Sequence, residues 1–97
     1  MNKESNHLLD GIRVIDAASF IAGPTAATIM SDYGAEVIKI EPQSGDSLRN
    51  LIVNGRMPEG KENYCWELTS RNKKSISLNL KDDVAHKILV DLIKSAD

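Results

Sequence analysis

The residues best suited to bind a ligand stand where two apolar runs of the sequence end. Asp16 closes the run 12–16, and the segment after it carries Gly23 and Pro24. Glu41 closes the next run, at the distance from Gly23 where a dinucleotide-binding motif places its ribose-binding acid. Only one glycine of G-x-G-x-x-G is present, however, and Pro24 offers no N–H to a phosphate. NAD or FAD binding is therefore one alternative, and a tight turn without a ligand is the other.

A cluster of cations indicates a second kind of site. Arg71, Asn72, Lys73 and Lys74 precede the third apolar stretch, and Lys81 follows it. Lys and Arg side chains near a strand end bind phosphates through charge-assisted hydrogen bonds. Because runs of charge are more often solvated surfaces, charge alone leaves both interpretations open.

Metal and nucleophile chemistry has less support in the sequence. His7 and His86 are far apart and Cys65 has no second thiol near it, so we expect no metal site. Cys65 and Ser70 lack an evident base partner, and we interpret both as packed or surface side chains.

Apolar periodicity predicts the elements that position these residues. Apolar runs predict strands at 12–16 and 36–41, and the alternating segment KSISLNL predicts a third strand at 74–80. Helical spacing predicts helices at 24–33 and 82–95. The second helix carries a single apolar stripe formed by Val84, Ala85, Ile88, Leu89, Leu92 and Ile93.

Proline and glycine mark the boundaries between these elements. Pro24 fits the first turn of the first helix, and Gly34 fits a left-handed residue at its end. Residues 42–64 contain scattered prolines, glycines and charges, which predicts an irregular excursion with a helical turn near 47–53.

The order of the elements predicts an α/β, Rossmann-like fold: a parallel sheet with flanking helices. A strand–helix–strand unit closes almost always as a right-handed crossover between parallel strands. Ligands of such sheets bind beyond the carboxyl ends of the strands, which here are 16–23, 41–46 and 79–81. Because the last helix should lead into another strand, we expect residues 9–97 to be a truncated domain, preceded by a flexible lead at 1–8.

Composition narrows the class of protein. The 97 residues, 27% charged and 41% hydrophobic, are typical of one small globular domain. The net charge of −2 gives no general attraction to nucleic acid or to membranes. No apolar run approaches the roughly 18 residues that span a bilayer, and the polar start MNKESNHL lacks the core of a signal peptide. With a single cysteine, we expect a reduced, cytoplasmic chain.

Four motifs, in this order, resemble a known family: L-x-G-I-R-V-I-D, A-G-P, D-Y-G-A-E-V-I-K-I-E and N-K-K-S-I-S-L-N-L-K. They make residues 9–97 similar to the N-terminal segment of the family III CoA-transferases, the relatives of formyl-CoA transferase, carnitine CoA-transferase and α-methylacyl-CoA racemase. The resemblance implies transfer of CoA between carboxylic acids, with acyl-CoA and a carboxylic acid as substrates and no tightly bound cofactor. It also implies interlocked homodimers, or complementation by a C-terminal partner chain.

The resemblance further implies which residues contact coenzyme A. Phe20 and Ile21 would lie beside its thioester end, and the segment 78–81 would receive its adenine and phosphates, with Lys81 as the charge partner. The full set of expected contacts is Phe20, Ile21, Arg71, Leu78, Asn79, Leu80 and Lys81.

Two departures from the family pattern bear on activity. Family members often carry a nucleotide-binding arginine directly after the acid that ends the second strand; here Pro follows Glu41, so Lys39 or Arg49 would have to replace it. The family's catalytic aspartate forms a mixed anhydride and then leads to an enzyme–CoA thioester. Asp16 and Asp97 do not match it, so we expect it beyond this chain and the chain alone to be inactive. A CoA-transferase segment, a non-catalytic CoA- or nucleotide-binding module and an inert remnant all stay open.

Overall fold

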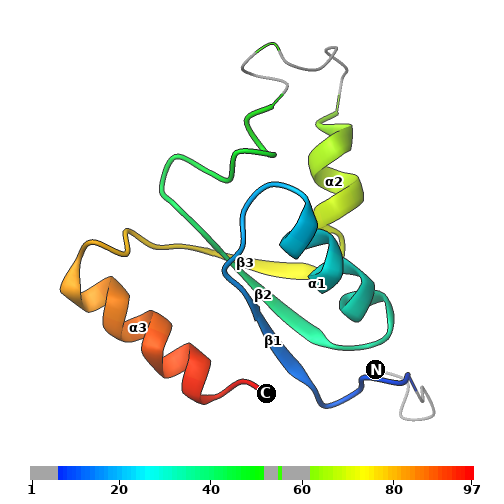
Figure 1. Cartoon of the computed structure of the whole chain (residues 1–97), viewed down its shortest axis with the longest axis horizontal. Helices are drawn as coiled ribbons and strands as arrows, with labels where there is room; N and C mark the ends of the chain where they lie inside the picture. Colours follow the sequence, from blue (N-terminus) through cyan, green and yellow to red (C-terminus); the bar gives the residue numbers. More distant parts are fainter. Residues whose placement is uncertain (1–6, 52–54, 56–61) are drawn as a thin grey trace.

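The computed structural model describes residues 7–51, 55 and 62–97, and Figure 1 shows them as a parallel sheet with α1 and α3 on opposite sides. In chain order the elements are β1 (Arg13–Asp16), α1 (Ala22–Asp32), β2 (Glu36–Glu41), α2 (Tyr64–Ser70), β3 (Lys73–Ser77) and α3 (Asp83–Lys94). The sheet order is β1-β2-β3, and both strand pairs are parallel. The predicted α/β class and parallel strand–helix–strand unit are confirmed.

Helix α1 begins at Ala22 rather than at residue 24, which still leaves Pro24 in the first turn. Gly23 packs so closely that a Cβ there would lie 2.4 Å from the Cβ of Ala18. Glycine therefore lets the first turn lie against the loop that follows β1. At the other end Gly34 has the predicted left-handed conformation, with φ at 102°.

Strand β3 ends at Ser77, so the predicted strand 74–80 is wrong in its last three positions. The side chain of Asn79 accepts a hydrogen bond from the N–H of Lys81 (3.2 Å), which turns the chain away from the sheet. Such local bonding by Asn competes with strand pairing. Leu78 is consequently buried while Leu80 is 42% exposed, and the two do not share one face as the alternation predicts.

Helix α2 is the element that apolar periodicity does not reveal. It begins after Asn63, whose side chain accepts a hydrogen bond from the N–H of Trp66 (3.4 Å) and donates one to the carbonyl of Arg49 (2.7 Å). Asn is a favoured N-cap residue, and that signal could have located the helix. Residues 47–51 form turns, in agreement with the prediction there, while 52–53 lie outside the described residues.

Each face of the sheet has its own apolar cluster. On the α1 side the buried members are Ala27, Ala35 and Val37, and on the α3 side they are Ile40, Leu78 and Ala85. Only part of the predicted apolar stripe of α3 packs against the sheet. Ala85, Leu89 and Leu92 pack inward, whereas the exposed members are Val84, Ile88 and Ile93.

Helix α3 crosses the sheet from β3 back to β1. At its far end the N–H of Asp97 donates to the carbonyl of Arg13 (3.0 Å), and the Asp97 carboxylate accepts from the N–H of Arg13 (3.0 Å). No helix within the described residues combines the length and the apolarity needed to cross a membrane.

Candidate functional site

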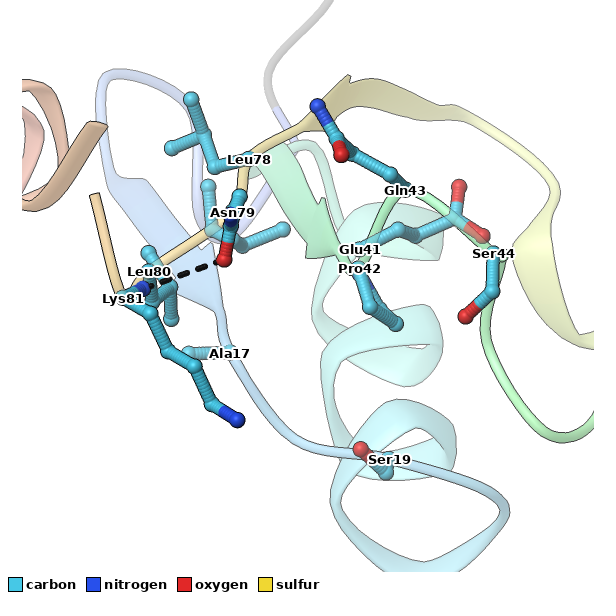
Figure 2. A pocket seen from close by; sticks show the side chains of 11 residues that line it. Ala17, Ser19, Glu41, Pro42, Gln43, Ser44, Leu78, Asn79, Leu80 and Lys81 are labelled. Carbon is cyan, nitrogen blue, oxygen red and sulfur yellow. Dashed lines mark hydrogen bonds between the residues drawn. The ribbon is translucent and has the colours of Figure 1, made fainter.

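The loops that follow the three strands surround a cleft of about 590 Å³ (Figure 2). It lies where the parallel fold predicts a ligand, at the carboxyl ends of the strands. The loop after β1 contributes Ala17 and Ser19, and the loop after β3 contributes 78–81. The end of β2 and its loop contribute Ile40, Glu41, Pro42, Gln43 and Ser44.

Figure 2 shows the two sides of this cleft facing one another. Lys81 extends from the loop after β3, while Pro42 and Ser44 stand on the opposite side and Ser19 lies on the loop below. The Lys81 side chain makes no ion pair with any of the described residues and lies exposed. Its ammonium group is therefore available to an anionic ligand.

Of the seven residues expected to contact coenzyme A, the structure brings four together in the cleft: Leu78, Asn79, Leu80 and Lys81. Phe20 and Ile21 do not line it. They follow Ser19, which does, and they are 42% and 49% exposed just before α1 begins.

Arg71 lies at the opposite end of β3 from Lys81. Its guanidinium forms two hydrogen bonds with the carboxylate of Asp32 (2.7 and 3.1 Å), which raise the pKa of Arg71 and lower that of Asp32. The side chain of Lys73 is buried against Asp16 (2.8 Å), and Lys74 pairs with Glu36 (3.3 Å). The expected cation cluster thus divides along β3: Arg71 precedes the strand, its first two residues are Lys73 and Lys74, and Lys81 follows its end.

Glu41 does not serve as the free acid that a dinucleotide site requires. Arg49 donates to both of its carboxylate oxygens (2.9 Å each), and Ser75 donates a further hydrogen bond (2.5 Å). Burial would raise the pKa of Glu41, but the bonds from Arg49, Ser75 and the N–H of Asp46 outweigh it and lower the pKa to about 2. Glu41 is thus an ionised, fully engaged structural group.

Neither proposed replacement for the family's nucleotide-binding arginine is free. Arg49 is held by Glu41, and its guanidinium carbon lies 4.0 Å from the centre of the Trp66 ring. Lys39 is only 1% exposed and lies between Asp16 (3.6 Å) and Asp46 (3.5 Å). Lys81 is therefore the cation that the cleft presents.

A buried charge network beneath the cleft was not expected from the sequence. The Asp16 carboxylate accepts from the ammonium of Lys73 (2.8 Å) and faces Lys39, while Lys39 also faces Asp46. Lys39 and Lys73 further donate to the carbonyls of Ala18 (3.0 Å) and Pro24 (2.8 Å). A lysine inside the apolar run EVIKIE was the one visible signal, because a buried cation requires partners.

No group of three or more His, Cys, Asp or Glu side chains within the described part of the chain is arranged to hold a metal ion.

The three-stranded parallel sheet with its flanking helices is an α/β fold, and its cleft lies at the carboxyl edge of the strands. The sequence model described as CoA-transferase family III matches residues 9–97. The chain belongs to this family.

Individual relatives are consistent with this family assignment. The chain is 42% identical over 96 residues to cinnamoyl-CoA:phenyllactate CoA-transferase of Clostridium sporogenes, covering 98% of this chain and 23% of that protein. It is 43% identical over 91 residues to (R)-2-hydroxy-4-methylpentanoate CoA-transferase of Clostridioides difficile, covering 93% and 23%. A CAIB/BAIF family protein from Brucella suis superposes with a TM-score of 0.83 at 27% identity, covering 96% and 25%. The chain thus spans about a quarter of the length of these relatives.

Proposed function

We propose that the cleft binds the nucleotide part of coenzyme A, and that residues 1–97 serve a CoA-transferase that moves CoA between carboxylic acids. The main support is the position of 78–81, which forms one wall of the cleft at the carboxyl edge of the sheet. The family resemblance implies that this segment contacts coenzyme A. In the proposed reaction a carboxylate supplied from outside this segment attacks the acyl-CoA. This attack on the thioester carbonyl expels the CoA thiolate and leaves a mixed anhydride. The thiolate then attacks the anhydride at the enzyme's carbonyl carbon, expels the donor acid and forms an enzyme–CoA thioester, from which the acceptor acid takes CoA by the same steps in reverse.

The groups around the cleft suit a nucleotide phosphate and a base. Lys81 supplies a positive charge, and Ser19, Gln43 and Ser44 supply polar side chains. Because Arg49 neutralises Glu41, the acid in the lining does not repel a phosphate. Leu78 and Leu80, which belong to the same wall, offer apolar surface to an adenine.

The acyl group of the substrate is proposed to be apolar. Phe20 and Ile21 are exposed on the loop that the family resemblance places beside the thioester. The two Clostridial relatives are named for aromatic and branched aliphatic acids, which would match such side chains. A dinucleotide site is the competing proposal, but the engagement of Glu41 weighs against it.

Calorimetric titration of the chain with CoA at low salt tests the proposal. We expect binding of roughly millimolar strength, about −4 kcal/mol. Lys81→Ala should weaken it by about fivefold, because an exposed ion pair contributes on the order of 1 kcal/mol or less and is screened by salt. Lys87→Ala removes the same charge from exposed α3 and is the matched control. Micromolar CoA binding that Lys81→Ala leaves unchanged would contradict the assignment of the cleft to coenzyme A. Tighter binding of NAD than of CoA would also contradict it.

A further inference from the structure

The side chain of Asp46 connects two walls of the cleft. Asp46 belongs to the loop after β2, two positions beyond Ser44 in the lining, and its side chain is 1% exposed. Its Oδ1 accepts a hydrogen bond from the N–H of Phe20 (3.3 Å), in the loop after β1, and another from the N–H of Leu48 (2.9 Å). One carboxylate therefore binds backbone groups of both loops.

The loop after β1 needs such support because Phe20 adopts a strained conformation. Its φ of 68° lies in the left-handed region, which bulky side chains disfavour. Lys39 donates to the carbonyl of Ala18 (3.0 Å) and lies 3.5 Å from the Asp46 carboxylate. The loop is thus held at Ala18 and at Phe20, on either side of the cleft residue Ser19.

We propose that Asp46 is a positioning residue of the cleft, holding the loop after β1 in the conformation that completes the coenzyme A site. Without the Oδ1 acceptor, Phe20 relaxes toward negative φ and carries Ser19 and Ile21 with it. This proposal rests on the proposed function for its binding readout. Its structural readout is independent of any ligand.

The test compares Asp46→Leu with Asp46→Asn in the full 97-residue chain. The two replacements match Asp in shape and remove the same charge, but only Asn keeps an oxygen that can accept from Phe20. Both leave Lys39 and Lys73 facing Asp16 alone, which destabilises the fold. The same pair is therefore also made in a Lys39→Met background, where the remaining Asp16 and Lys73 charges balance.

Two measurements are made on each variant: NMR hydrogen exchange at the Phe20 amide, and calorimetric titration with CoA. With Leu at position 46, we expect exchange about tenfold faster and CoA binding about tenfold weaker, the effect of losing one partly buried hydrogen bond. With Asn, both should stay within about threefold of the parent. Asp32→Ala, which removes a carboxylate from the Arg71 end of the molecule, should change neither.

If the Leu and Asn variants show the same Phe20 exchange rate and the same CoA affinity, the positioning role of Asp46 is overturned. If Asp46→Leu does not fold, the comparison in the Lys39→Met background decides. If the parent chain binds no CoA, the proposed function fails, while the Phe20 exchange rates still support or reject the role of Asp46.

Discussion

The two faces of the sheet are built on different chemistry. Toward α3, β2 presents Ile38 and Ile40, which pack with apolar side chains of β3 and of the helix. Toward α1, the same strand presents Val37, which packs in an apolar cluster, followed by Lys39 and Glu41, which pair with charged side chains. The apolar face derives its stability from buried area, whereas the polar face depends on a balance of charges at the base of the cleft.

Within the described residues, each buried carboxylate of the α1 face has a cationic partner, and the two kinds of charge are equal in number. The carboxylates are those of Asp16, Asp46 and Glu41, and the cations facing them are Lys39, Lys73 and Arg49. No buried side-chain nitrogen or oxygen of the described residues lacks a hydrogen-bond partner. Removing one member should therefore cost more than removing a matched pair.

The largest effect is expected when Asp16 is replaced. Asp16→Leu leaves Lys39 paired with Asp46 alone and Lys73 without its carboxylate partner, and we expect a loss of about 4 kcal/mol in the free energy of unfolding. Urea denaturation of the variant measures it.

The control is the double variant Asp16→Leu/Lys73→Met, which keeps the buried charges equal. Its loss should fall below about 2 kcal/mol, because a buried ion pair can be replaced by apolar groups at little cost. If single and double variants are equally destabilised, the charges on the α1 face are not coupled.

On the apolar face, Ile40→Ala should lower the free energy of unfolding by about 3 kcal/mol. Ile40 is buried in the cluster beneath α3, so the change removes buried methylene groups and leaves a cavity. Val84→Ala deletes apolar atoms from the exposed side of α3 and should change stability by less than about 0.5 kcal/mol. Similar losses for both variants would mean that α3 does not pack as described.

The same contrast explains what the sequence could predict. The strand at 36–41 and the left-handed Gly34 follow from local patterns, and both are confirmed. The early end of β3 depends on a side-chain bond of Asn79, which alternation does not encode. The sequence could not predict the role of Asp46, because its partner Phe20 belongs to a different loop that only the folded chain brings close. The family resemblance grouped Arg71 with 78–81 as contacts of coenzyme A, although the order of the sequence already placed Arg71 before the third strand and Lys81 after it.

Acid should weaken the polar face through Glu41. Its pKa of about 2 in the folded chain lies below its ordinary value of 4.5, so its stabilisation is complete above about pH 5.5 and is lost as pH falls toward 2. We expect about 2 kcal/mol to disappear over this range, after allowance for solvent around the half-exposed Arg49.

Denaturation midpoints between pH 6 and pH 2.5 measure this loss. Glu41→Gln removes the titrating group, so the variant should be less stable at pH 6 and lose less stability on acidification than the parent chain. A parallel decline in both proteins would assign the acid sensitivity to other carboxylates.

The smallest expected effect is in catalysis: the 97-residue chain alone should transfer no CoA. A carboxylate nucleophile needs a free oxygen facing the substrate, and the one carboxylate among the described residues of the cleft lining is Glu41, with both oxygens occupied. Asp16 and Asp46 are buried in the charge network beneath. Incubation with an acyl-CoA and an acceptor acid, with CoA esters separated by chromatography, should therefore match a control without protein. Turnover above that control that is abolished by Glu41→Gln, but retained in Asp32→Ala, would show that Glu41 reacts despite its bonds to Arg49 and Ser75, and that the polar face is catalytic rather than structural.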